Sequence, residues 1–147
     1  MSEVLPRTDD EDTAGFWQAA KQGRLVVQKC TSCGEVRFPP HPYCGKCRST
    51  GHDWLPVSGY GRVWTYAFVY KPMLPAFEKY TPFPIVYVEL EDHPPLRMAG
   101  NLVAAPEAEI NSVDHDKVKV GLRVKVVFRD RADDVALPYW MPVEEGA

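Results

Sequence analysis

Two C-x-x-C pairs, Cys30-Thr-Ser-Cys33 and Cys44-Gly-Lys-Cys47, decide the fold of this chain. They contain all four cysteines, lie within 18 residues and are separated by ten. Each pair can wrap a backbone knuckle so that both thiolates point at one ion, and four soft thiolates in a tetrahedron suit Zn²⁺ at about 2.3 Å per bond. The spacing therefore predicts one structural zinc ion in a zinc ribbon, with no open position for a catalytic water.

Other uses of the four cysteines fit less well. Residues Met1–Asp12 are acidic and show no secretory signal, so we expect a cytoplasmic, reducing location in which disulfides are disfavoured. Thioredoxin-like redox chemistry usually uses one C-x-x-C inside a βαβ pattern, which is absent here. Iron accepts the same four thiolates and stays the alternative metal.

Composition limits the function classes. Of the 147 residues 45% are apolar and 25% charged, which is ordinary for a soluble domain. The net charge of -3 argues against a protein whose main task is to hold nucleic acid. No apolar run approaches the roughly 20 residues that cross a bilayer, so no membrane partner is expected.

The segment before the ribbon predicts a short helix over residues 13–22. Acidic residues and Thr13 suit its N-terminus, and Gly23 is a suitable stop. A helix of this length needs tertiary contacts, which Phe16 and Trp17 would supply. The preferred interpretation places both side chains in the protein's own core, and the alternative places them against a partner chain.

The rest of the chain predicts short β-strands. The 14 prolines and 10 glycines are dispersed, as in chains with many short segments and fixed turns. Strand-like runs of alternating, β-branched or aromatic residues are 25–29, 61–70, 84–90, 96–103 and 122–128, with residues 118–120 and Gly121 before the last of these runs and a final apolar stretch at 136–142. A mainly β protein follows, with a C-terminal five-stranded barrel of the OB type. We expect an N-terminal segment (1–24, unpatterned over 1–8), a ribbon (25–57) and a barrel domain (58–147).

No catalytic constellation is recognisable. The histidines are His41, His52, His93 and His115, and none is placed with a nucleophile or carboxylate in a known arrangement. The triplet 114–116, Asp-His-Asp, is read as a polar turn rather than a metal site. These absences favour a protein that is not an enzyme.

Two apolar features need cover. Alternation predicts one side of a strand for Trp64, Tyr66, Phe68 and Tyr70, with the barrel core as the preferred location and a partner-facing surface as the alternative. The loop 71–84 carries apolar side chains that would be costly to expose, and we predict that a partner or an acyl chain covers them. These side chains are Met73, Leu74, Phe77, Tyr80 and Phe83.

Several stretches resemble a known family, and the likeness covers residues from about Asp9 to Pro142. In the ribbon half they are Gly15–Leu25, Gln28–Cys30, Cys33-Gly34, Phe38–Pro40, Tyr43-Cys44 and Cys47, and in the barrel half Gly59–Tyr66, Pro84–Leu90 and Gly121–Val126. Together they are similar to the acyl-CoA-associated family that joins a zinc ribbon to an OB-fold, long catalogued as a domain of unknown function.

The resemblance implies a short N-terminal helix, a rubredoxin-like ribbon and a C-terminal OB barrel. It also implies a non-catalytic accessory subunit that binds and stabilises a thiolase-like acyl-CoA enzyme, such as a thiolase or retro-aldolase, and helps shape its acyl-CoA site. Some relatives pair with hydratases instead. Two alternatives stay open: a single-stranded nucleic-acid binder, because ribbons and OB barrels both hold single strands, and a stand-alone acyl-CoA binder.

Overall fold

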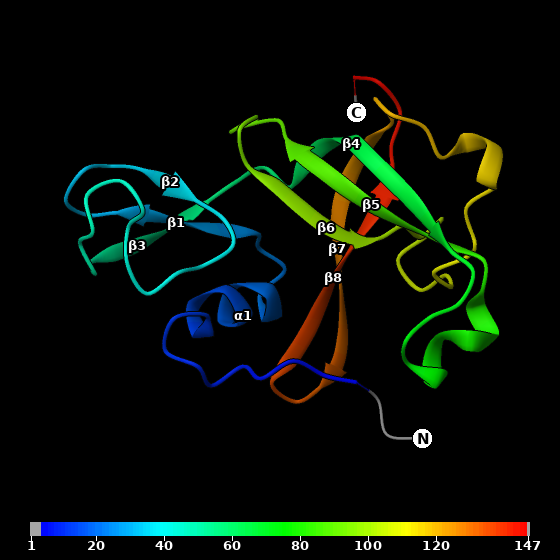
Figure 1. Cartoon of the computed structure of the whole chain (residues 1–147), viewed down its shortest axis with the longest axis horizontal. Coiled ribbons are helices and arrows are strands. Elements are labelled where there is room, and N and C mark those ends of the chain that lie inside the picture. The colour runs from blue at the N-terminus through cyan, green and yellow to red at the C-terminus, as the bar shows by residue number, and fades with distance from the viewer. Residues whose placement is uncertain (1–3, 147) are drawn as a thin grey trace.

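The computed structural model describes residues 4–146 as a mainly β protein with one short helix, as predicted, and residues 1–3 of the expected unpatterned start lie outside them (Figure 1). The N-terminal half contains α1 (Ala14–Lys21), β1 (Val26–Cys30), β2 (Val36–Arg37) and β3 (His52–Pro56). The C-terminal half contains β4 (Tyr60–Val69), η1 (Pro75–Tyr80), β5 (Phe83–Leu90), β6 (Arg97–Asn101), η2 (His115–Lys117), β7 (Arg123–Ala132) and β8 (Val135–Pro142).

Helix α1 begins and ends close to the predicted bounds, but the backbone N–H groups at its N-terminus find an acceptor other than the expected Thr13 side chain. Thr13 makes no side-chain capping bond, and the carbonyl of Asp10 instead accepts from the backbone N–H groups of Thr13 and Ala14. The stop is as predicted, because Gly23 takes a φ of 72° that only glycine adopts without strain. Phe16 is buried and Trp17 packs half-buried against the core, as the preferred interpretation required.

Two antiparallel sheets follow. In the ribbon the order is β2-β1-β3, so β1 lies in the centre. In the barrel the order is β6-β5-β4-β7-β8, and a bridge between Leu102 and Trp140 closes the sheet on itself. This is the five-stranded OB-type barrel that the strand pattern predicted.

One core cluster includes residues of both halves. Leu25, Val26 and Val27 from the ribbon pack in the same cluster as Val63 and Val88 from the barrel. Helix α1 contacts β8 and adds Phe16 to this cluster. The division at residues 24/25 and 57/58 stays a prediction, but the packing shows that ribbon and barrel bury apolar surface against each other.

Residues 118–120 form no strand: Val118 packs into the core, and the chain turns at Gly121, whose φ is 89°. The expectation of unbroken alternation over 61–70 is wrong. A β-bulge between Val63 and Thr65 breaks the alternation of β4.

The bulge divides the aromatic side chains of residues 64–68 between two faces. Trp64 contacts Tyr87 on the outer face of the sheet, whereas Tyr66 and Phe68 contact each other opposite Val86 on the inner side. Trp64, Tyr66 and Tyr70 are exposed and Phe68 is half-buried, so the preferred location in the barrel core was wrong for the first three.

Candidate metal centre and docking surface

The four cysteine sulfurs meet at one end of the ribbon. All lie within 4.8 Å of one another, and the Sγ–Sγ distances of Cys30–Cys47 and Cys33–Cys44 are both 3.6 Å. A disulfide needs about 2.05 Å, whereas a tetrahedron of Zn–S bonds of 2.3 Å places its sulfurs about 3.8 Å apart. The donor set and its spacing therefore fit one tetrahedral metal ion and not a disulfide.

Two equivalent knuckles create this arrangement. The N–H of Gly34 donates to the carbonyl of Cys30 at 3.0 Å, and the N–H of Arg48 donates to the carbonyl of Cys44 at 2.8 Å. Both donors follow the second cysteine of their pair and have positive φ, 76° at Gly34 and 65° at Arg48. A non-glycine residue rarely accepts this conformation, so the second knuckle keeps its shape against a local cost.

The electrostatics of Cys30, Cys33 and Cys44 favour a cation at this place. The backbone N–H of Cys33 lowers the pKa of Cys30 to about 6, against an opposing desolvation, and the N–H groups of Cys47 and Lys46 lower the pKa of Cys44. At Cys33 the N–H of Glu35 also lowers the pKa, but desolvation and the neighbouring sulfurs outweigh it and raise the pKa to about 12. Four thiolates so close together ionise fully only around a metal, which supplies the missing positive charge.

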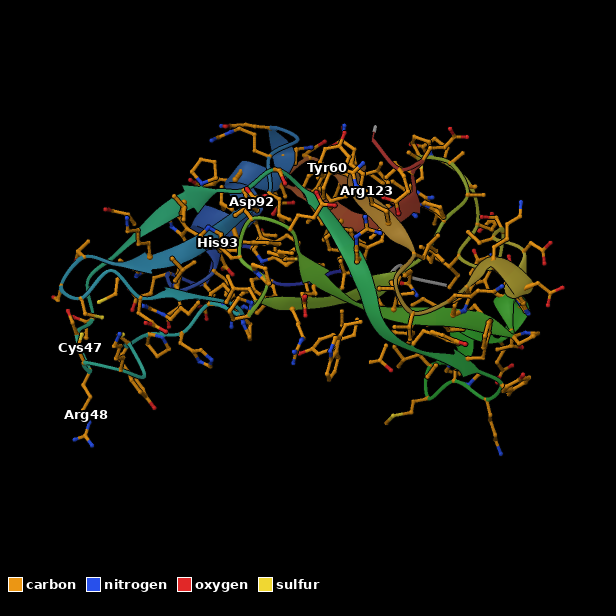
Figure 2. All side chains as sticks on the ribbon, turned by 90° about the horizontal axis from the view of Figure 1, so that it is seen from above. Cys47, Arg48, Tyr60, Asp92, His93 and Arg123 are labelled. Carbon is orange, nitrogen blue, oxygen red and sulfur yellow. The ribbon has the colours of Figure 1, made fainter. Side chains whose placement is uncertain are left out.

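The metal centre is half covered. Cys30 and Cys44 are buried, whereas Cys33 and Cys47 are exposed. Figure 2 shows Cys47 and Arg48 at the outer end of the ribbon, with the Arg48 side chain directed away from the rest of the molecule. Because all four tetrahedral positions are taken by protein sulfurs, the centre has a structural role.

The histidines and carboxylates form no second centre among residues 4–146, where the cysteine cluster is the only group of metal-type side chains that meet. Asp114 accepts a hydrogen bond from the N–H of Asp116, and the His115 ring lies 4.6 Å from that of Phe68. The triplet 114–116 is thus a capped polar turn, as interpreted from the sequence. No helix of the described part is long and apolar enough to span a bilayer.

The loop that was predicted to need cover is only partly buried. Met73 is 98% exposed and Leu74 is also exposed, whereas Phe77 and Tyr80 are half-buried and Phe83 is buried in a small second core cluster. The contact of these residues with a partner or an acyl chain, like that of Phe16 and Trp17, stays a prediction.

An apolar cavity of about 420 Å³ lies under this loop, with Leu74, Phe77, Phe83 and Ile85 in its wall and Lys71 as its only charged lining residue. A neighbouring cavity of about 410 Å³ shares Phe77 with it. It is more polar, with charged side chains of both signs in its wall: Lys79, Glu109, Arg129 and Arg131.

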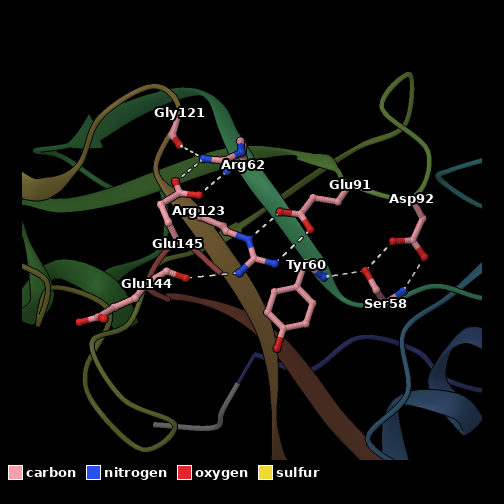
Figure 3. A network of polar contacts seen from close by, with 9 residues as sticks. All are labelled: Ser58, Tyr60, Arg62, Glu91, Asp92, Gly121, Arg123, Glu144 and Glu145. Atoms are coloured by element: carbon pink, nitrogen blue, oxygen red, sulfur yellow. Dashed lines mark hydrogen bonds and ion pairs between the residues drawn. The ribbon is translucent and has the colours of Figure 1, made fainter. Parts of the chain in front are cut away.

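Sequence reasoning missed a polar network where the ribbon joins the barrel (Figure 3). Ser58, which links β3 to β4, donates from its N–H and its Oγ to the carboxylate of Asp92 at 2.8 and 2.5 Å. The Ser58 hydroxyl thereby lowers the pKa of Asp92. These bonds fix the linker against the turn between β5 and β6. In the sequence, the turn-forming residue types at these positions were the only indication of such contacts.

The same network continues across the end of the barrel. Arg123 on β7 donates to Glu91 at 2.7 Å and lies 4.5 Å from the centre of the Tyr60 ring, while Arg62 pairs with both carboxylate oxygens of Glu145 at 2.6 Å. Hydrogen bonds from Arg123 and from Arg62 lower the pKa of Glu91 and of Glu145, respectively. The network ties β4, β5, β7 and the C-terminal segment together and contains no group poised for acid–base chemistry.

Comparisons with known proteins agree with this architecture. Residues 17–53 match the family description "ChsH2, rubredoxin-like zinc ribbon domain", and residues 54–129 match "ChsH2, C-terminal OB-fold domain". A "Probable enoyl-CoA hydratase alpha subunit" of Thermomonospora curvata is 33% identical over 90% of this chain, which spans only 38% of that relative's length. A "DUF35 domain-containing scaffold protein" of Methanocaldococcus jannaschii is 33% identical, with 92% of this chain and 94% of the relative covered.

One solved structure, titled "Ltp2-ChsH2(DUF35) aldolase", is similar to this chain with a TM-score of 0.75 and 32% identity. The match covers 93% of this chain and 98% of the other. Ribbon and barrel thus occur together, in the same order, in similar proteins.

Proposed function

Because this chain belongs to the ChsH2 family, in which a rubredoxin-like zinc ribbon precedes an OB-fold domain, we propose that it is a non-catalytic accessory subunit of an acyl-CoA enzyme. Its partner is a thiolase-like enzyme, a thiolase or a retro-aldolase, which it binds and stabilises and whose acyl-CoA site it helps to shape. The relatives named as a scaffold protein and as a hydratase subunit, and the similar chain from an aldolase structure, support such a role.

The observation that carries the proposal is the apolar surface of the barrel. Six large apolar side chains on the outer face of β4 and β5 and on the following loop are exposed: Trp64, Tyr70, Met73, Leu74, Ile85 and Tyr87. From their exposed fractions they leave on the order of 700 Å² in water, close to the roughly 800 Å² that each partner buries in a standard protein interface. A soluble monomer rarely exposes so much apolar surface, which supports a protein partner at this place.

The metal centre supports a scaffold rather than a catalyst. We propose that the ion is zinc and that Cys30, Cys33, Cys44 and Cys47 hold it. A bound zinc ion supplies a cross-link that a ribbon of this size lacks. With all four positions taken by protein sulfurs, the metal has no open site for substrate, and we assign the chemistry to the partner.

The apolar cavity supports the part of the proposal that concerns the acyl-CoA site. Its volume of about 420 Å³ and its lining by Leu74, Phe77 and Phe83 suit an acyl chain, and the ammonium of Lys71 at its wall suits a nearby anionic group. The same cavity favours the second candidate, a stand-alone acyl-CoA binder, because it is formed by this chain alone.

The deciding experiment is affinity purification of the tagged chain from its native host, followed by mass spectrometry and metal analysis. Recovery of a thiolase-like acyl-CoA enzyme in near-equal amounts supports the accessory role. Recovery of the chain alone, with octanoyl-CoA binding measured by calorimetry, favours the stand-alone binder. Recovery of RNA or DNA with salt-sensitive binding to oligonucleotides contradicts both.

A pair of variants locates the contact. Leu74→Ser combined with Phe77→Ser is expected to weaken complex formation while one metal ion per chain stays bound. Val120→Ser is the control, because Val120 is also an exposed apolar side chain but lines neither cavity. If the double variant and the control assemble equally well, the loop is not the contact.

A further inference from the structure

One long edge of the barrel sheet has no neighbour. Strand β4 pairs with β5 along its whole length, but its pairing with β7 ends at Arg62, and the last bonds on that side join Val63 to Gly121 and Leu122. Within residues 4–146, no backbone hydrogen bond connects 64–69 to any segment other than β5. In Figure 1 this part of β4 lies at the outer border of the sheet.

This free edge is also accessible from both faces of the sheet. The bulge after Val63 turns Trp64 to the outer face and Tyr66 to the inner one, and each side chain is still about two-fifths exposed, at 46% and 38%. Thr65 and Ala67 are exposed as well. A strand with four consecutive exposed residues and a free edge can accept a neighbour and grip its side chains on both faces.

The composition of the edge shows that it is unprotected. The run 64–70 reads Trp-Thr-Tyr-Ala-Phe-Val-Tyr and contains neither a charge nor a proline. Natural sheets protect exposed edges with charged residues, prolines or short strands, because unpaired N–H and C=O groups of an apolar strand recruit other chains. A run without such protection is stable in solution when another strand covers it.

We propose that the free edge of β4 at residues 64–69 receives an extended strand of the partner subunit, so that the barrel sheet continues into that protein. The added strand is apolar in its centre and carries a carboxylate at the end that lies beside Lys71, because Lys71 follows the uncharged run and has no carboxylate partner among the described residues. Only the assignment of this strand to an acyl-CoA enzyme rests on the proposed function, since the edge and its chemistry belong to this chain.

Charge disfavours a second copy of this chain as the occupant. If two copies paired antiparallel about the centre of the run, residue 64 would face residue 69, and therefore residue 62 would face residue 71. Lys71 of each copy would then lie near Arg62 of the other at both ends of the pairing. Because Glu145 already neutralises Arg62, this pair offers no net negative charge, and Lys71, which has no carboxylate partner among the described residues, would stay without a counter-ion in both copies. An acid-flanked strand has no such conflict.

The test uses a synthetic strand as the probe. The peptide Glu-Thr-Val-Thr-Val-Thr-Val-Glu with blocked ends is titrated against the full chain, with tryptophan fluorescence and hydrogen exchange as readouts. We expect slowed exchange within 64–69, and about tenfold weaker binding when both Glu are replaced by Lys at low salt. A peptide N-methylated at alternate residues, which cannot complete the ladder, should not bind. Equal binding of the N-methylated peptide overturns the proposal.

Two exposed alanines on the same face of the sheet provide matched variants. Ala67 lies on the free edge, whereas Ala99 lies two strands away on β6, opposite Tyr87. Ala67→Asp should weaken binding of the acid-flanked peptide about tenfold and Ala99→Asp by less than about twofold. Equal effects of the two variants would mean that the sheet face rather than the edge binds.

The outcome for the natural complex is separate. Hydrogen exchange of the co-purified complex should show protection of 64–69 relative to the free chain. If a thiolase-like enzyme co-purifies but these amides exchange as before, the strand proposal fails and the accessory role stands. If the peptide binds but no acyl-CoA enzyme co-purifies, the accessory role fails, and with it the assignment of the strand to that enzyme. A dimer of this chain protected at 64–69 would make the second copy the occupant and overturn the proposal.

Discussion

Gln28 connects the ribbon to the segment before α1, and its replacement by leucine is the sharpest test of how this molecule is held together. The side chain is 0% exposed. Its Oε1 accepts hydrogen bonds from Arg37 Nε and from the backbone N–H of His41, both at 2.8 Å, and its Nε2 donates to the carbonyl of Asp12 at 3.3 Å. One amide thus joins β1 to β2, to the loop at His41 and to the segment before α1.

Gln28→Leu keeps the approximate volume and removes both kinds of hydrogen bond. The Nε of Arg37, whose residue is only 9% exposed, and the N–H of His41 lose their acceptor. A buried donor without a partner costs about 1–3 kcal/mol, and more when it is charged. We therefore expect the free energy of unfolding to fall by about 3–5 kcal/mol, a large part of the roughly 5–15 kcal/mol of an ordinary domain.

A second substitution distinguishes hydrogen bonding from packing. In the pair Gln28→Leu with Arg37→Leu the guanidinium that lacked an acceptor is gone, and so is its Nη1, which has no partner even in the parent chain. Removing both members of a buried polar pair is often close to neutral. The double variant should therefore recover about half of the lost stability, although it changes more atoms.

The assay is urea unfolding of the metal-loaded chain, followed by circular dichroism, with bound metal measured on the same samples. The reasoning is refuted if Gln28→Leu costs less than about 1 kcal/mol. It is also refuted if the two substitutions add, because additive effects would mean that Gln28 and Arg37 do not act as a pair.

Three further predictions follow from the structure. Gly61→Ala should destabilise the barrel by about 2 kcal/mol or more, because the new Cβ would lie 2.4 Å from Val88 Cγ1 and 2.6 Å from the backbone oxygen of Glu89. Thermal unfolding would show the loss of stability. Cys47→Ser should lose the metal on dialysis against a chelator that the parent chain withstands, although Cys47 is exposed; metal analysis checks this, and full retention would contradict a four-thiolate centre. The bond from Arg123 lowers the pKa of Glu91 below its ordinary value of 4.5, so its stabilisation is present above that pH and is lost as the pH falls through the lower folded-state pKa. Glu91→Gln should therefore flatten the acid limb of a plot of melting temperature against pH.

The features that the sequence revealed are local ones. The spacing of the four cysteines is enough to predict that their sulfurs meet, because each knuckle closes within five residues of chain. The strand runs could be read for the same reason, since a period of two residues is a property of the strand itself. The β class and the metal-binding cysteines were thus accessible without coordinates.

The features that escaped prediction depend on how segments meet. A single bulge after Val63 places Trp64 and Tyr66 on opposite faces of the sheet, and no residue type in the run 61–70 indicates a bulge there. Residues 118–120 have no neighbouring strand to pair with and form part of a turn, from which only Val118 enters the core. Gln28 gave only a faint signal, because an amide beside Lys29 in the strand Val26–Cys30 does not stand out as buried.

The ribbon and the free edge of β4 share one core cluster, although they lie in different halves of the molecule. Val26 and Val27 belong to the strand that leads into Cys30, and they pack in the same cluster as Val63 and Val88, the pair immediately before the bulge of β4. A cluster packed at crystal-like density transmits a displacement rather than absorbing it. We therefore expect that removal of the metal, which takes away the cross-link beside β1, speeds hydrogen exchange of residues 64–69 in the free chain. Unchanged exchange of these amides after metal removal would mean that the ribbon and the free edge are independent.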